Sequence, residues 1–348
     1  CCFKGRTFHL NTNRLEIAND SMDRLKKLSE FLHSKERTSV FVGNSLSNEE
    51  YEAIKDTLDL IAPNAIVSVK EVDDFRTFLV QASDKGLKRG TLGQLYEADV
   101  AFVIDENLDE DLPLISSMLR KRVREGDLKV IYSGSTPGLL DKGSTILLKT
   151  NAVELAPLFD SLSGTGLIQS ASKFTGINEE NIVLAKNTLA AAKRPITLVG
   201  PKVASSTTSS LALINLCIKL DRCFYLPLYR GANTEGALCI LGDLLTPAID
   251  NLSMIKEGNA TQLLAIEPDQ LTIGLIRAVI NGVIKCALLT SKAHDDINAD
   301  ILMPITRWHE RYGHVTNLSG SILKQNKTAL PPKSVDTLSN LLKILGEL

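Results

Sequence analysis

Residues 98–132 read ADVAFVIDENLDEDLPLISSMLRKRVREGDLKVIY, and they predict a strand, a helix and a second strand in succession. The runs ADVAFVI (98–104) and LKVIY (128–132) are short and apolar throughout. ISSMLRKRVRE (115–125) lies between them and has the spacing of a basic helix. Fully apolar strands are typical of a parallel sheet that helices cover on both faces. This stretch therefore predicts an α/β fold.

The same alternation of short strands and helices runs through the rest of the chain. Ser47 and Glu50 have capping-box spacing at the start of one predicted helix. The Ser- and Gly-rich stretch at 161–176 lacks a strong periodicity and is interpreted as a boundary loop. We therefore predict two doubly wound parallel-sheet units, at 1–162 and 178–348, joined by a linker at 163–177. A last helix is predicted to pack as a cap through Val335, Leu338, Leu341, Leu342 and Leu345.

The composition is that of an ordinary globular protein. The chain has 348 residues, of which 44% are apolar and 23% charged, and at ~150 residues per domain this length allows about two domains. Its net charge of −2 gives no net electrostatic attraction to nucleic acid, so no nucleic-acid partner is expected. No run reaches the ~18 apolar residues that would span a bilayer. We expect any membrane connection to come through partners.

The cysteines predict neither a disulfide framework nor a metal cluster. They are sparse, and none forms the short C-x-x-C spacing of iron-sulfur or zinc sites. Cys217 and Cys286 lie in apolar runs and are predicted to be packed small hydrophobic residues. The first residues, CCFKGRTFHLNTN, contain no apolar segment of a signal peptide, and their lack of Met suggests processing or a fragment. The six cysteines are Cys1, Cys2, Cys217, Cys223, Cys239 and Cys286.

The loops after the strands are where an open α/β sheet binds its ligands. Gly43 follows one strand, but the sequence has neither a G-x-G-x-x-G dinucleotide motif nor a P-loop. The loop Asp105–Asp111 carries five carboxylates, which would repel a phosphate. It is interpreted as a solvated acidic loop or a partner contact.

Two other polar segments are candidates for a site. In YRGANTEGA (229–237), Gly231 and Gly236 flank Asn233 in a turn that is either a backbone cradle for a planar ligand or, as we favour, a well-capped turn. His309 and His314 flank Arg311, and a structural role is favoured over a catalytic one.

Four stretches, in this order, resemble the molybdopterin-type oxidoreductases and the related half of the large iron-sulfur subunit of respiratory complex I. The resemblance covers nearly the whole chain. The stretches are YEADVAFVIDENLDEDLPLISSMLRKRVREGDLKVIYSG (96–134), KRPITLVGP (193–201), RGANTEGA (230–237) and NADILMPITRWHERYGHVTNLSGSILK (298–324).

The departures from this family are informative. Asp105 and Glu106 stand where the active enzymes have Gly and Thr, and Ser321 stands where the closing motif has Arg. No ligand for molybdenum can be placed. The resemblance therefore implies the C-terminal half of the complex I subunit, a scaffold with no catalytic residue, metal or cofactor. It leaves a vestigial cleft whose candidate residues are Gly43, Asn107, Gly231, Asn233, Gly236 and Asn317.

The complex I interpretation also implies partners and a location. The partners would be the iron-sulfur half of the same subunit, on a separate chain if the subunit is split, and other subunits of the hydrophilic arm. The location would be the matrix side of the mitochondrial inner membrane, or the cytoplasmic face of a bacterial membrane.

Two alternatives remain. One is an active molybdopterin-dependent oxidoreductase of formate dehydrogenase type, with its clusters on another chain. The other is a nucleotide-binding regulator that uses the turn at Gly43 or Gly231.

Overall fold

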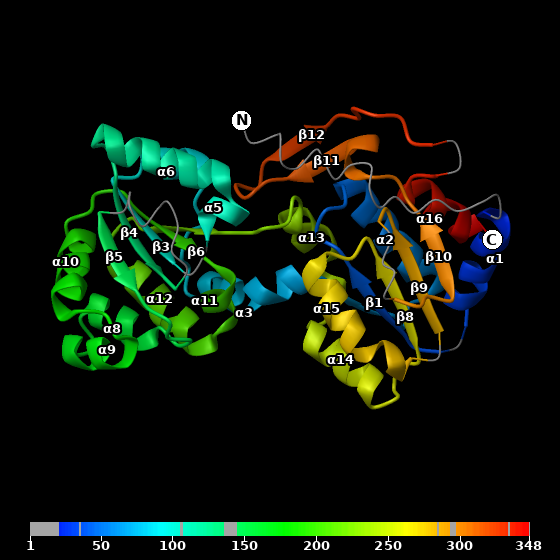
Figure 1. Cartoon of the computed structure of the whole chain (residues 1–348), viewed down its shortest axis with the longest axis horizontal. Helices are drawn as coiled ribbons and strands as arrows, with labels where there is room; N and C mark the ends of the chain where they lie inside the picture. The colour runs from blue at the N-terminus through cyan, green and yellow to red at the C-terminus, as the bar shows by residue number, and fades with distance from the viewer. Residues whose placement is uncertain are drawn as a thin grey trace. The chain divides into compact units, whose positions relative to one another are not determined.

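The protein forms two α/β units, each built around a parallel sheet (Figure 1). The structure is a computed structural model, which describes residues 21–34, 36–104, 107–135, 145–283, 285–292, 297–332 and 335–347. Unit 1 takes its residues from 1–72, 231–317 and 322–348, and unit 2 from 73–230 and 318–321. The predicted α/β fold with two doubly wound units is confirmed.

Unit 1 contains a five-stranded sheet in the order β10-β9-β8-β1-β2, with every pairing parallel. Along β1, Val40 and Val42 pack into one apolar cluster, whereas Phe41 packs into another on the opposite face. Helices therefore cover both faces of this sheet. The strands are β1 (Thr38–Val42), β2 (Ile66–Ser68), β8 (Gln262–Ile266), β9 (Lys285–Thr290) and β10 (Ile301–Pro304).

The helices of unit 1 bury the apolar faces that the sequence predicts. Ser47 caps α2, and its capping box with Glu50 is present, as predicted. The five apolar residues named for the predicted last helix are all buried, but the helix begins at Leu338, so Val335 lies before it. The helices are α1 (Ser21–Leu32), α2 (Asn48–Ile61), α13 (Thr234–Leu241), η1 (Gly242–Leu244), α14 (Ala248–Lys256), α15 (Gln270–Val279), η2 (Ile280–Gly282), η3 (Trp308–Glu310) and α16 (Leu338–Glu347). An antiparallel hairpin adds β11 (Gly313–Thr316) and β12 (Ile322–Gln325).

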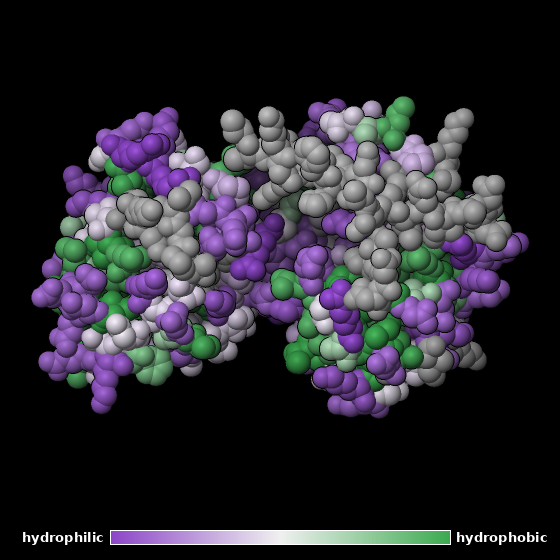
Figure 2. All heavy atoms as spheres, viewed as in Figure 1, coloured by the Kyte–Doolittle hydropathy of each residue, from purple (hydrophilic) through white to green (hydrophobic). Residues whose placement is uncertain are grey.

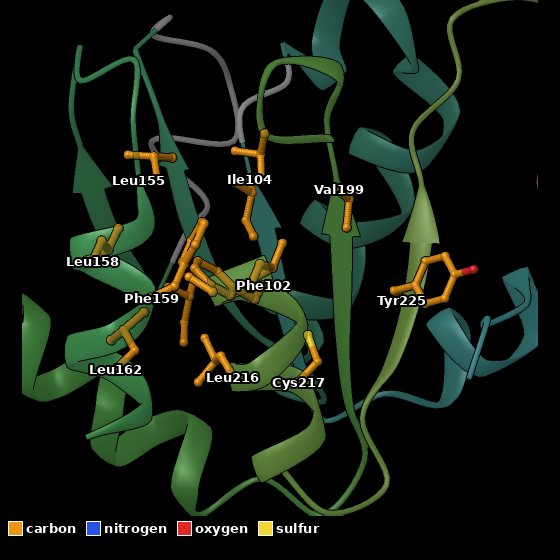
Figure 3. Close-up of a cluster of buried hydrophobic side chains, with 14 of the residues drawn as sticks. Phe102, Ile104, Leu155, Leu158, Phe159, Leu162, Val199, Leu216, Cys217 and Tyr225 are labelled. Carbon is orange, nitrogen blue, oxygen red and sulfur yellow. The ribbon is translucent and has the colours of Figure 1, made fainter. Parts of the chain in front are cut away.

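Unit 2 contains a second five-stranded parallel sheet, in the order β5-β4-β3-β6-β7. Along β3, Phe102 faces the apolar cluster of Figure 3, whereas Ala101 and Val103 face another cluster. In the first cluster the rings of Phe102 and Phe159 meet edge to face, with centroids 6.1 Å apart. The strands are β3 (Val100–Ile104), β4 (Lys129–Gly134), β5 (Ile146–Lys149), β6 (Pro195–Val199) and β7 (Phe224–Pro227).

The helices of unit 2 include the basic helix predicted at 115–125, which is α6. Figure 2 shows hydrophilic atoms gathered over it, in line with its sequence. The helices are α3 (Lys70–Asp84), α4 (Leu92–Glu97), α5 (Leu108–Asp111), α6 (Pro113–Glu125), α8 (Ala156–Ser163), α9 (Ile168–Thr175), α10 (Glu179–Ala190), α11 (Pro201–Ser205) and α12 (Thr207–Lys219).

Two predictions about organisation differ from the structure. The stretch 163–177 is not a linker, because it carries the end of α8 and all of α9 inside unit 2. Gly164 and Gly176 end these two helices in the left-handed conformation, so the glycines mark helix ends and no boundary. The units are not 1–162 and 178–348, because β1 pairs with β8 and unit 1 is discontinuous.

The acidic loop also differs from its prediction. Leu108–Asp111 forms the short helix α5, in which Asn107 Nδ2 donates to Glu110 Oε2 over 3.0 Å. Asp105 and Glu106 lie outside the described residues. Among the residues that are described, no helix combines the length and the apolar character needed to cross a membrane.

Phe159→Ala is expected to destabilise unit 2 by about 3–5 kcal/mol, because it removes a fully buried ring and its contact with Phe102. Urea unfolding followed by circular dichroism measures the change. The matched control is Val153→Ala, whose side chain is 89% exposed and which should change the free energy of unfolding by under ~0.5 kcal/mol. Equal effects of the two substitutions would contradict the core assignment.

Candidate functional site

The carboxyl edge of the unit 1 sheet is the first place to look for a site. The order β10-β9-β8-β1-β2 reverses between β8 and β1, and open α/β sheets bind ligands at such a switch point. Gly43 follows β1 there, and its N–H donates to Ile266 O over 2.9 Å. A Cβ at Gly43 would lie 1.9 Å from Glu267 O, so only glycine fits. The two strand ends therefore close tightly on each other.

A buried ion trio lies at this switch point. Arg311 is 3% exposed; its Nη1 lies 3.0 Å from Glu50 Oε2, and its Nη2 lies 3.6 Å from Glu267 Oε1. Arg311 Nε also donates to Thr306 O over 2.7 Å. Two carboxylates thus share one guanidinium away from solvent, an arrangement that is stable only with further hydrogen bonds.

Ser291, at the end of β9, supplies those bonds to Glu267. Its backbone N–H donates to Glu267 Oε2 over 2.7 Å, and its hydroxyl donates to Oε1 over 2.5 Å. Glu267 itself has φ +42°, in the left-handed region that non-glycine residues seldom adopt. The strained backbone of Glu267 is held by these hydrogen bonds from Ser291 and by the ion pair with Arg311.

A third buried carboxylate, Glu71, organises the turn that the sequence analysis identified as a candidate site. Its Oε2 accepts from Asn44 Nδ2 over 2.7 Å, from the Gly231 N–H over 2.9 Å and from the Thr234 hydroxyl. A Cβ at Gly231 would lie 2.4 Å from Asn44 Cγ. The space over this turn is therefore occupied by the protein's own side chains.

Asn233 completes the turn. Its Nδ2 donates to Leu46 O over 2.7 Å and to Asn48 Oδ1 over 2.9 Å, and its Oδ1 accepts from the Thr316 N–H over 2.7 Å. A Cβ at Gly236 would lie 2.3 Å from Asn233 Oδ1. The family resemblance implies a pterin beyond such strands, but this turn does not fit one, because Asn44, Asn48 and Asn233 fill it.

The predicted cleft residues divide between the two units. Gly43, Gly231, Asn233 and Gly236 come together at the edge of unit 1. Asn317 directly follows Thr316, at the end of β11 in the same unit. Asn107 lies in unit 2, at the start of α5. Their role as a vestigial cleft stays a prediction.

Sequence reasoning missed the charged residues of this edge. Glu71 lies in the first turn of α3, and Glu267 directly follows β8, a position that could have drawn attention to it. Arg311 was noticed only as the neighbour of two histidines. Of these, His314 is half exposed and its Nδ1 lies 2.5 Å from Glu49 Oε1. Burial alone would raise the pKa of Glu49, but hydrogen bonds from the side chain and backbone N–H of His314 outweigh it and lower that pKa.

Unit 2 has a cavity at the corresponding edge of its own sheet. Its volume of about 430 Å³ is in the range of small-molecule sites. It lies beyond the carboxyl ends of β4 and β5 and beside α11, with Lys202 and Ser135 among its polar groups. Its lining is Gly134, Ser135, Thr150, Asn151, Ala152, Val153, Glu154, Leu155, Lys202, Val203, Ser205 and Ser206.

The carboxylate of Glu154 is the charged acceptor in the lining of this cavity. Glu154 accepts from the hydroxyls of Ser206 and Thr208 over 2.9 and 2.6 Å, and from that of Ser209. Burial alone would raise the pKa of Glu154. The hydrogen bonds from the three hydroxyls outweigh the effect of burial and lower that pKa, so the carboxylate is charged. Ser133 Oγ, one residue before the lining, is buried with no hydrogen-bond partner. The cavity can accept a polar molecule, and within the described ranges no three His, Cys, Asp or Glu side chains gather to hold a metal ion.

Comparison with known proteins identifies solved structures of similar fold. No protein-family model matches the sequence, and no curated protein sequence matches it. One similar solved structure is a chain of the formyltransferase/hydrolase complex (FhcABCD) from Methylorubrum extorquens in complex with methylofuran. It has 14% sequence identity and a TM-score of 0.72, with 96% of this chain and 97% of that chain covered. Another is acetylene hydratase from Pelobacter acetylenicus, with 11% identity, a TM-score of 0.67, and 97% and 60% covered.

These likenesses establish the molybdopterin-oxidoreductase-like fold and correct two expectations. The expected membership of complex I is wrong, since neither similar protein belongs to that complex. The expectation of a chain with no chemistry of its own is also wrong, because both similar proteins are enzymes. The likeness at 14% and 11% identity is one of fold.

Arg311→Met is expected to destabilise unit 1 by about 3–5 kcal/mol, because it leaves Glu50 and Glu267 buried without their cation. Chemical denaturation measures the loss. The matched control is Lys121→Met, which breaks an exposed pair with Glu125 and should cost under ~1 kcal/mol. A cost below ~1 kcal/mol for Arg311→Met would show that the trio contributes no more than a surface pair.

Glu49→Gln is expected to change the acid dependence of stability. The folded-state pKa of Glu49 lies below the ordinary 4.5, so its contribution is present above that value and is lost as the pH falls through the folded-state pKa. Because the pair is half exposed, the advantage of the wild type should be under ~1 kcal/mol. Denaturation curves from about pH 6 to about pH 3 test this. A wild-type advantage that grows toward low pH would contradict the sign.

Proposed function

We propose that this chain is a subunit of a formyltransferase/hydrolase complex of the FhcABCD kind. The observation that carries the proposal is the mutual coverage with the chain from Methylorubrum extorquens. The two chains overlap over 96% of one and 97% of the other, at a TM-score of 0.72. A match from end to end supports equivalent subunits, because neither chain has a large region that the other lacks.

The acetylene hydratase comparison supports the same choice. This chain spans only 60% of that enzyme, so the remainder of the hydratase has no counterpart here. In a complex of the FhcABCD kind, this subunit would act together with other chains. The cavity of unit 2, lined by Lys202, Ser135 and Asn151, is the place where this subunit would bind a small polar molecule.

A second candidate is a molybdopterin-dependent oxidoreductase of formate dehydrogenase type with its clusters on another chain. The cavity beyond the carboxyl ends of β4 and β5 favours it, because open α/β sheets bind ligands at that edge. The filled turn over Gly231 and Gly236 counts against it.

Purification of the tagged full-length chain from its native cells tests both candidates. We expect a fixed-stoichiometry complex with a formyltransferase subunit, together with formyl transfer or hydrolysis by that complex. Mass spectrometry identifies the partners, and elemental analysis of the same sample measures molybdenum and tungsten.

Each result of this purification decides the matter. Formyl chemistry by a complex that contains the chain supports the first candidate. Stoichiometric molybdenum or tungsten without formyl chemistry supports the second and overturns the first. A chain that purifies alone, with neither metal nor activity, contradicts both. The matched control is a purification from untagged cells.

A further inference from the structure

Two buried cysteines of unit 2 meet at one hydroxyl. Cys217 lies in the last turn of α12 and is 1% exposed, and Cys223 directly precedes β7 and is 6% exposed. Cys217 Sγ donates to Thr197 Oγ1 over 3.4 Å, and Cys223 Sγ lies 3.6 Å from the same oxygen. Both sulfurs therefore lie within hydrogen-bonding distance of the same hydroxyl oxygen. Figure 3 shows Cys217 on α12 within the apolar cluster.

The turn between the two cysteines brings them together. The Cys223 N–H donates to Leu220 O over 3.2 Å, which folds the chain back at the end of the helix. Arg222 has φ +61°, so a non-glycine residue adopts the left-handed conformation at the reversal. The proximity is therefore built by the backbone and does not depend on flexible side chains.

The surroundings assign different reactivities to the two thiols. The interaction between the two thiols lowers the pKa of Cys223, and together with burial it raises the pKa of Cys217. Cys223 is also the more exposed of the two. Because the thiolate is the nucleophile, Cys223 is the residue that an oxidant would meet first. Cys286 in unit 1 is a contrast, since burial raises its pKa to about 12.

We propose that Cys217 and Cys223 form a redox-active dithiol pair that peroxide converts to a reversible disulfide. The Cys223 sulfur attacks one peroxide oxygen and the O–O bond breaks; the leaving oxygen takes a proton and departs as water, and Cys223 becomes a sulfenic acid. The Cys217 sulfur then attacks the sulfenic sulfur, an S–S bond forms, and a second water leaves. Two thiols and one hydrogen peroxide thus yield one disulfide and two waters. A dithiol reductant restores the thiols.

Peptide mapping of the native full chain tests this pair. The protein is treated with hydrogen peroxide, its remaining thiols are alkylated, and it is digested with trypsin without reduction. Cleavage after Lys202, Lys219, Arg222 and Arg230 places Cys217 in 203–219 and Cys223 in 223–230. We expect these two peptides to be joined and lighter by two hydrogen atoms, and to separate after dithiothreitol.

Matched variants sharpen the test. Cys217→Ser and Cys223→Ser should each abolish the joined peptide, whereas Cys286→Ser should leave its yield unchanged. The wild-type map needs no variant, so the proposal stands or falls even if a substitution prevents folding. Recovery of both peptides alkylated and separate would overturn it. So would a link that forms only in urea, or Cys223 recovered as sulfinic acid with no link.

Discussion

The closure of the sheet edge at Gly43 and Glu267 is the constraint on which unit 1 depends. It joins β1 to β8, whose paired residues Thr38 and Gln262 lie 224 positions apart. A contact between such distant segments carries a large loop-closure cost, so the strand ends need interactions that hold them in register. Arg311 provides these, because it reaches Glu50 after β1 and Glu267 after β8 from a third segment of the chain. A discontinuous unit is thus fixed by charges at its edge as well as by its apolar layers.

The two units use charge differently near the carboxyl edges of their sheets. In unit 1 the carboxylates are neutralised by Arg311 or bound by amides, and they close the edge. In unit 2 Glu154 binds the hydroxyls at the start of α12 and leaves a cavity beside it. A carboxylate surrounded by hydroxyl donors remains charged and attracts polar or cationic groups. The edge of unit 2 is therefore the better place to look for a ligand.

Local sequence patterns determined how much of the fold and of the candidate site could be predicted. Apolar runs such as 98–104 specify buried strands wherever they occur, and the pair of Ser47 and Glu50 specifies a helix start from four residues alone. The composition of the units could not be derived in this way, because strand pairing depends on contacts between distant segments. The Ser- and Gly-rich stretch 161–176 misled for a related reason: its glycines end helices whose apolar residues are buried only in the folded unit. The ion trio was missed because its members come from three separate parts of the sequence.

The family resemblance predicted the fold correctly and the membership of complex I wrongly, and both outcomes have one physical cause. The quoted motifs are mainly strand-to-loop and loop-to-helix transitions, which any chain of this fold must contain. These transitions are required by the fold and not by one activity, and a single fold supports many activities. What distinguishes proteins that share such a fold is the chemistry at the strand ends. An assignment of function must therefore start from the edges of the sheets. At those edges the chain has filled the turn of unit 1 with its own amides and has kept an open polar cavity in unit 2.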